Sequence, residues 1–174
     1  NLSGVEAPVT FAVNDLGEGK KVEIVQSLAK WKRYTLWRHH IEAGKGIYTD
    51  MNALRPCEEL DNIHSIYVDQ WDWEKVMLES ERTTEYLHHT VKCIYKALKH
   101  TEYLLCEQYP VFTPFLPDEI HFMHAEELRQ EYPGLTPKER EHEIRKKYGA
   151  VFIQGIGCAL GAGTQHDTRS SDYD

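Results

Sequence analysis

The sequence is poor in the features that would place a protein in a membrane or on a secretory route. It has no run of about 18 apolar residues and no basic segment followed by an apolar core, so we expect neither a membrane span nor a signal peptide in the 174 residues. The four cysteines form no C-x-x-C pair, which argues against a zinc ribbon or thioredoxin-type chemistry. We therefore expect a cytoplasmic protein with reduced, structural thiols at Cys57, Cys93, Cys106 and Cys158.

Positive charge is also scarce, since 20 Lys and Arg residues stand against 28 Asp and Glu residues, for a formal net charge of -8. This balance argues against nucleic acid as the main partner, although a local Lys/Arg cluster can still hold a nucleotide. Hydrophobic residues make up 41% of the chain, which suffices for one ordinary core, so we expect a single domain over residues 1–174. Because the chain starts at Asn1 without Met and ends at Asp174 in a polar cluster, we expect that domain to lack N-terminal and C-terminal portions.

Apolar periodicity in the first part of the chain predicts a mixture of strands and helices. Two β-rich runs, 9–13 and 21–25, flank a Gly-containing loop and predict an antiparallel hairpin. Ser27 precedes a run that continues towards His40, which predicts a helix with Ser27 as its N-cap. A longer amphipathic helix is predicted to begin after Trp73 and to continue to about Tyr109.

The remainder predicts short elements joined by turns. A Pro-rich connection, 110–117, leads to a strand at 119–123 and a helix at 125–132. Thr136, Pro137 and Glu139 match a capping box with proline at the first helical position, so a helix should begin there and end at Gly149. A strand at 150–154 and a glycine-rich turn at 155–163 follow; the glycine spacing of this turn departs from the dinucleotide-binding fingerprint, and we interpret it as a flexible hairpin.

The run from Ser65 to Trp73 has the alternation of a strand but places polar side chains on both faces. Gln70 and Asp72 share one face, and Asp69 lies on the other. A buried carboxylate needs a partner such as an Arg or a substrate amine. Two interpretations stay open: a pocket floor formed by Gln70 and Asp72, or a strand whose polar end emerges into solvent.

A second polar cluster closes the sequence, from Gln165 to Asp174. Arg169 among carboxylates suits a phosphate or carboxylate clamp, because a guanidinium gives bidentate hydrogen bonds; the alternative is a polar surface loop. His121 and His124 are not expected to share a metal, because residues three apart on a strand face opposite ways. No metal-ligating residue is predicted.

Several strings, taken together and in order, resemble the aspartate-ammonia ligase family, the type A asparagine synthetases. They are NLSG at 1–4, SLAKWKR at 27–33, LRP at 54–56, HSIYVDQWDWE at 64–74, PFLPD at 114–118, GAVF at 149–152, and HD at 166–167 through DYD at 172–174. The resemblance implies an α+β fold: a largely antiparallel sheet flanked by helices, as part of a catalytic core similar to that of class II aminoacyl-tRNA synthetases, in a homodimer. It also implies the synthesis of L-asparagine from L-aspartate and ammonia, with ATP and Mg²⁺, through a β-aspartyl-adenylate, with release of AMP and pyrophosphate.

The same resemblance implies a role for each matched residue. Arg55 and Gln70 are the expected catalytic residues, Arg55 at the reacting carboxylate and the α-phosphate and Gln70 at the β-carbonyl. Asp72 is expected to pair with the substrate α-ammonium. Ser27 and Lys32 complete the amino-acid site, and Arg55, Arg169 and Asp174 form the nucleotide side.

Two other functions stay open: a non-catalytic paralogue that binds amino acid or nucleotide, and a synthetase-like enzyme that adenylates an amino acid for transfer to tRNA. The family carries an acidic residue just before the match to Asn1, and further N-terminal and C-terminal segments that include an Arg-containing ATP motif. Because these lie outside the 174 residues, we expect the isolated chain to lack robust activity.

Overall fold

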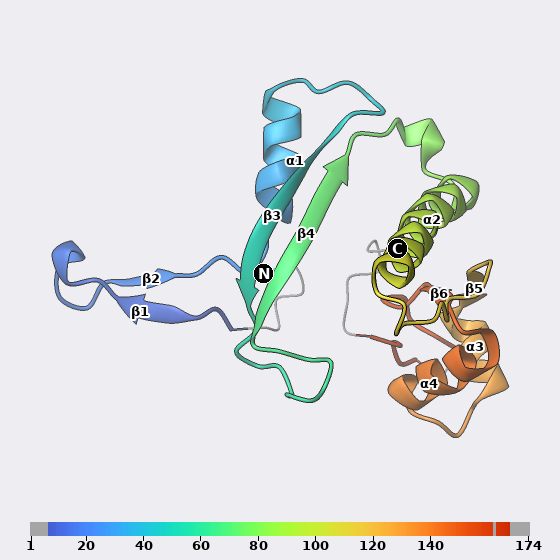
Figure 1. Ribbon diagram of the computed structural model, residues 1–174. Helices are drawn as coiled ribbons and strands as arrows, with labels where there is room; N and C mark the ends of the chain where they lie inside the picture. Colours follow the sequence, from blue (N-terminus) through green and yellow to red (C-terminus); the bar gives the residue numbers. More distant parts are fainter. Residues whose placement is uncertain (1–6, 162, 168–174) are drawn as a thin grey trace. The chain divides into compact units, whose positions relative to one another are not determined.

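The computed structural model describes residues 7–161 and 163–167. By its internal contacts the chain divides into two compact units, Asn1–Glu79 and Ser80–Asp174, and each is described by itself. Figure 1 labels the helices and strands of both. Within the described residues, no helix is long and apolar enough to cross a membrane.

The first unit begins with the predicted hairpin. β1 (Thr10–Ala12) pairs antiparallel with β2 (Lys21–Glu23), and the short 3-10 helix η1 (Asn14–Leu16) lies in the loop between them. Gly17 follows η1 with a φ of 94°, a value that favours glycine because it has no Cβ to clash. The antiparallel pairing of this hairpin is therefore confirmed.

The centre of the first unit is a long antiparallel pair, β3 (Gly46–Leu54) and β4 (Tyr67–Lys75). β4 confirms the alternation predicted for the 65–73 run, because Val68, Gln70 and Asp72 are half-buried whereas Tyr67, Asp69, Trp71 and Trp73 are exposed. β3 was not predicted. Its register with β4 places Thr49 opposite Asp72 and Met51 opposite Gln70.

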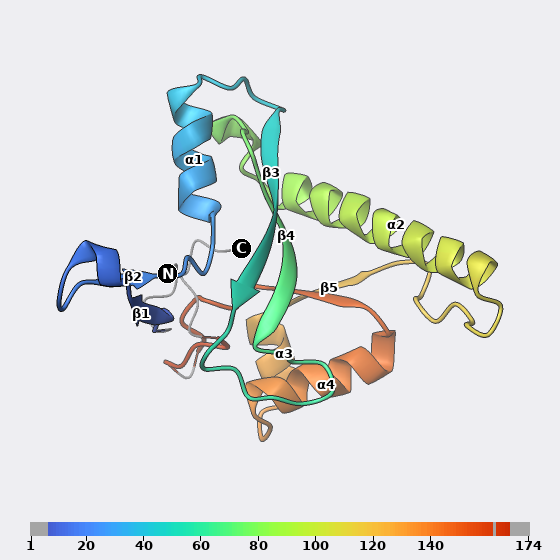
Figure 2. The ribbon, with the colours of Figure 1, turned by 60° about the vertical axis from the view of Figure 1, so that its left-hand side comes forward.

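Helix α1 (Ala29–Arg38) packs on one face of this strand pair, as Figures 1 and 2 show. Ala29 and Leu36 of the helix, with Met51 and Ala53 of β3, are buried and form the small core of the unit. The N-cap prediction was wrong by one position: Leu28 holds that place, and the backbone N–H of Ala29 donates to Oγ of Ser27 at 3.1 Å.

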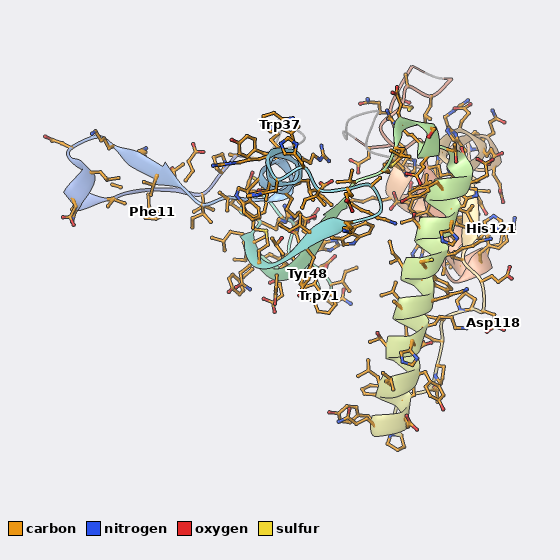
Figure 3. The ribbon with its side chains drawn as sticks, turned by 90° about the horizontal axis from the view of Figure 1, so that it is seen from above. Phe11, Trp37, Tyr48, Trp71, Asp118 and His121 are labelled. Carbon is orange, nitrogen blue, oxygen red and sulfur yellow. The ribbon has the colours of Figure 1, made fainter. Side chains whose placement is uncertain are left out.

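The opposite face of the β3–β4 pair is exposed within this unit. Tyr48 and Trp71 are 79% and 84% exposed, and Figure 3 shows both on the side of the strands away from α1. The face that carries Gln70 and Asp72 is therefore the one that α1 covers.

The second unit corrects the prediction of one helix from Trp73 to Tyr109. β4 instead continues to Lys75, which pairs with Gly46, and the 3-10 helix η2 (Glu79–Glu81) precedes α2 (Thr84–Gln108). α2 begins where Oγ1 of Thr83 accepts a hydrogen bond from the backbone of Tyr86, an N-cap that the apolar periodicity did not reveal.

The last part of the second unit is built from β5 (His121–His124), α3 (Ala125–Glu131), α4 (Pro137–Tyr148) and β6 (Val151–Gln154). β5 and β6 pair in parallel, and Leu128 of α3 and Ile144 of α4 are fully buried. The predicted capping box of α4 is confirmed, because Thr136 and Glu139 exchange hydrogen bonds and Pro137 is the first helical residue. Gly149 ends α4 with a φ of 79°.

The described residues thus combine helices with three strand pairs, of which two are antiparallel and one is parallel. This mixture confirms the α+β class. The finer prediction, a class II synthetase-like core, stays a prediction.

Candidate functional site

Four of the predicted site residues converge on the face of the β3–β4 pair that α1 covers. Gln70 and Asp72 project from β4, Lys32 comes from α1, and Arg55 directly follows β3. The backbone N–H of Arg55 donates to the carbonyl of Ile66 at 2.7 Å, which extends the strand pairing by one step and fixes the start of the Arg55 side chain. These four residues all belong to the first unit.

Lys32 and Asp72 form an ion pair, with 2.5 Å between Nζ and Oδ2. The Lys32 side chain is 0% exposed and that of Asp72 is 20% exposed. Oδ2 of Asp72 is itself buried and has no hydrogen-bond partner in the described part of the chain, so the ion pair with the Lys32 ammonium is what balances its charge. Removing one member of a buried pair typically costs about 3–5 kcal/mol, because the other charge is left uncompensated. This contact gives the Asp72 carboxylate the partner that a buried charge needs, and the pocket floor formed by Gln70 and Asp72 stays a prediction.

Thr49 is a third member of this group, and sequence reasoning missed it. Nζ of Lys32 donates to Oγ1 of Thr49 at 3.1 Å, and Oγ1 of Thr49 donates to the backbone carbonyl of Asp72 at 3.3 Å. The signal that could have found it is the alternation of β3, in which Thr49 shares a face with Met51 and Ala53.

Arg55 and Gln70 form the second pair of the site. Nη2 of Arg55 donates to Oε1 of Gln70 at 3.0 Å. A guanidinium has no acceptor, so the contact fixes which end of the Gln70 amide faces Arg55 and leaves the amide nitrogen as the donor end. The pair can therefore receive a carboxylate, with donors from the guanidinium and the amide.

The two pairs lie on adjacent same-face positions of β4. Side chains two residues apart on a strand are about 7 Å apart, so one small ligand can reach both Gln70 and Asp72. The Lys32–Asp72 pair offers one charge of each sign, which suits a zwitterionic head group, and the Arg55–Gln70 pair suits an additional carboxylate.

The other residues predicted from the sequence do not belong to these two pairs. Ser27 lies just before α1, half-buried, and its Oγ is the acceptor for the Ala29 backbone. Arg169 and Asp174 lie outside the described residues. Asp69 faces away from the site and accepts a hydrogen bond from the side chain of Asn52.

The two histidines for which a metal was not expected have contacts within the second unit. The ring of His121 stacks on Tyr148 with 3.6 Å between ring centroids, and Nδ1 of His124 accepts from the backbone of Glu126 at the start of α3. Both residues thus contribute to packing and helix capping.

Comparison with known proteins identifies the family. All of the chain, residues 1–174, matches the family described as aspartate-ammonia ligase. Similar proteins include the aspartate--ammonia ligases of Parabacteroides distasonis (59% identical), Bacteroides fragilis (57%) and Bacillus cytotoxicus (55%). Each match covers 100% of this chain but 50%, 50% and 53%, respectively, of the relative, so the chain spans about half the length of the curated relatives it matches. The chain belongs to the aspartate-ammonia ligase family, which confirms the resemblance found in its sequence.

Proposed function

We propose that the protein containing this chain makes L-asparagine from L-aspartate and ammonia, with ATP converted to AMP and pyrophosphate. Family membership supports the proposal. The observation that carries it in the structure is the placement of the Lys32–Asp72 and Arg55–Gln70 pairs side by side on one face of β4. Together these pairs offer the charges that complement an amino acid with a carboxylate side chain.

The amino-acid substrate binds by its charges. Asp72 accepts hydrogen bonds from the α-ammonium, Lys32 donates to the α-carboxylate, and Ser27 adds a hydroxyl at the start of α1. The α-ammonium and α-carboxylate bring no net charge, so their burial against the Lys32–Asp72 pair leaves its charge balance unchanged.

Adenylation joins two anions, which is the electrostatic difficulty of the first step. An oxygen of the β-carboxylate attacks the α-phosphorus of ATP, a P–O bond forms, and pyrophosphate leaves with the electrons of the broken P–O bond. Arg55 donates to the carboxylate and to the α-phosphate and reduces their repulsion in the transition state. Ammonia then attacks the β-carbonyl carbon, the C–O bond to AMP breaks, and a proton leaves the nitrogen.

Gln70 acts in both steps through its amide. Because Oε1 accepts from Arg55, the amide nitrogen is the end that donates to the β-carbonyl oxygen. That oxygen gains negative charge when ammonia attacks, so the donor stabilises the transition state more than the ground state.

The nucleotide side is proposed from the family resemblance. Arg169 and Asp174 are assigned to it, with Mg²⁺ supplied together with ATP to neutralise phosphate charge. In residues 7–161 and 163–167, no three His, Cys, Asp or Glu side chains converge as metal ligands. Lys32, Asp72, Arg55 and Gln70 are assigned to the amino-acid side of the reaction by their ion pair and their hydrogen bond.

The remaining proposals concern the whole protein. We assign it a class II synthetase-like catalytic core, of which residues 1–174 form part of a single domain, and a cytoplasmic homodimer as its working state. The mixed helix and strand pairs are compatible with this core. Light scattering of a full-length ligase that carries this sequence measures the dimer directly.

Aspartate-dependent pyrophosphate release by that full-length ligase tests the proposed function. We expect release that depends on aspartate and ATP, and asparagine and AMP as products when ammonia is present. Pyrophosphate release without asparagine formation, together with charging of tRNA, would favour the synthetase-like alternative. Aspartate binding without any pyrophosphate release would favour the non-catalytic paralogue.

A further inference from the structure

The hydroxyl of Thr49 contacts both residues of the Lys32–Asp72 ion pair, the ammonium of Lys32 and the backbone of Asp72. Its Oγ1 is 3.1 Å from Nζ of Lys32 and 3.3 Å from the backbone carbonyl oxygen of Asp72. The strand register places Thr49 directly opposite Asp72, so the hydroxyl links the helix-borne cation, β3 and the backbone of β4. Its position is set by backbone pairing on both strands.

Chemistry fixes the direction of both hydrogen bonds. An ammonium only donates, so Oγ1 of Thr49 accepts from Lys32. The single hydroxyl proton is then directed to the carbonyl of Asp72, which can only accept. Thr49 is therefore a neutral acceptor for Lys32 whose orientation is held from the opposite strand.

Substrate binding changes the contacts that the members of this ion pair must make. Under the proposed function, the carboxylate of Asp72, whose Oδ2 is 2.5 Å from Nζ of Lys32, must also contact the substrate α-ammonium. Lys32 is fully buried. Water therefore cannot take over the contact that its ammonium loses when Asp72 binds the substrate. The bond from Thr49 to the backbone carbonyl of β4 does not depend on the carboxylate of Asp72.

We propose that Thr49 is a positioning residue for the amino-acid site. Its hydroxyl holds the ammonium of Lys32 in place while Asp72 exchanges that contact for the substrate α-ammonium, so that Lys32 faces the α-carboxylate. This role rests on the proposed function, and it concerns affinity for the amino acid rather than the chemical steps.

The test compares Thr49→Val with Thr49→Ser in the full-length ligase. Valine keeps the shape and removes the hydroxyl, and serine restores the hydroxyl. We expect Thr49→Val to raise KM for aspartate about tenfold, which corresponds to about 1.4 kcal/mol. KM for ATP and kcat should stay within about twofold, and Thr49→Ser should behave like wild type. Thr10→Val, the same change at an exposed strand position, is the matched control.

Two outcomes would overturn the role. One is a Thr49→Val enzyme with an unchanged KM for aspartate. The other is a parallel loss in kcat and every KM together with a lower melting temperature, which would indicate a structural role only. Failure of the proposed function is distinguishable, because wild type would then form no asparagine. Calorimetry of aspartate binding to wild type and Thr49→Val would then still test the positioning role of Thr49. An absence of aspartate binding by wild type would overturn both proposals.

Discussion

The contact with Arg55 orients the Gln70 amide, so that under the proposed function its nitrogen is the end that donates to the substrate. The guanidinium contact at 3.0 Å orients the amide, and the half-buried position of Gln70 on β4 holds it on the covered face. Replacing Gln70 by a residue of the same size that cannot donate should therefore affect the chemical steps separately from substrate binding.

We expect Gln70→Glu to lower kcat by about 100-fold or more, the size of effect seen when one oxyanion donor is lost. A carboxylate at this position would still accept from Arg55, so the local fold should persist, but it would repel the developing charge on the β-carbonyl oxygen. Initial rates of asparagine formation by the full-length ligase measure the change.

Asp69→Asn is the matched control for this substitution, because Asp69 lies one residue away on the opposite face of β4. Its activity should stay within about threefold of wild type, since an amide can still bond to Asn52. A Gln70→Glu enzyme with near-normal kcat would remove Gln70 from the chemical steps.

The sequence predicted Gln70 and Asp72 as a pair because period-two alternation depends only on the strand itself. It did not predict Thr49, whose role depends on the register between β3 and β4, and register is a tertiary property. The partner of Asp72 was likewise undetermined: Lys32 lies 40 positions earlier in the chain and reaches the site only because α1 packs on the strand pair.

At the scale of elements, the glycine-rich turn after β6 is held by helix α3. Oε2 of Glu126 accepts from the backbone N–H of Gly161 at 3.0 Å, and the side chains of Arg129 and Gln130 donate to the same carboxylate. These donors, chiefly Arg129, hold the pKa of Glu126 well below its ordinary value of 4.5.

This carboxylate predicts a dependence of stability on pH. A folded pKa below the unfolded value stabilises the fold above pH 4.5, and the stabilisation is lost as pH falls from there towards the folded pKa. We expect Glu126→Gln to lower the melting temperature at pH 7, because the amide nitrogen would face donors. The difference in melting temperature between Glu126→Gln and wild type should become smaller below pH 4.5.

Thermal unfolding of the two proteins between pH 3 and pH 7 checks this prediction. Glu143→Gln is the control, since Glu143 pairs with Lys146 at a more exposed position of α4 and has no contact with the turn among its described bonds. If Glu126→Gln lowers the melting temperature at pH 7 no more than Glu143→Gln does, the contact with Gly161 contributes little to stability.

Elements with strong local signals, such as the β1–β2 hairpin and α4, were predicted well, whereas the pairing of β3 with β4 was not predicted. The capping box at Thr136 and the end of α4 at Gly149 depend on hydrogen bonds within a few residues, so the sequence carries them. The boundary between β4 and α2 was wrong, because the last residues of β4 are held by β3, a strand whose alternating polar and apolar residues were not interpreted.

At the scale of the molecule, the site in the first unit is only the amino-acid side of the proposed reaction. Lys32 pairs with Asp72 and Arg55 pairs with Gln70 within that unit, whereas the chain spans about half the length of its relatives. Binding of an amino acid and its adenylation should therefore be separable in experiments that compare the 174 residues with a full-length ligase.

We expect the 174-residue chain to bind L-aspartate weakly and to form asparagine at least about 100-fold more slowly than the full-length ligase, because misplacing reacting groups by about 1 Å already costs that factor. Calorimetry measures the binding, and product formation with ATP and ammonia measures the rate. Circular dichroism first establishes that the chain is folded, and Asp72→Asn reports whether binding uses the predicted site. Asparagine formation by the folded 174 residues at the full-length rate would show that residues 1–174 suffice for the whole reaction.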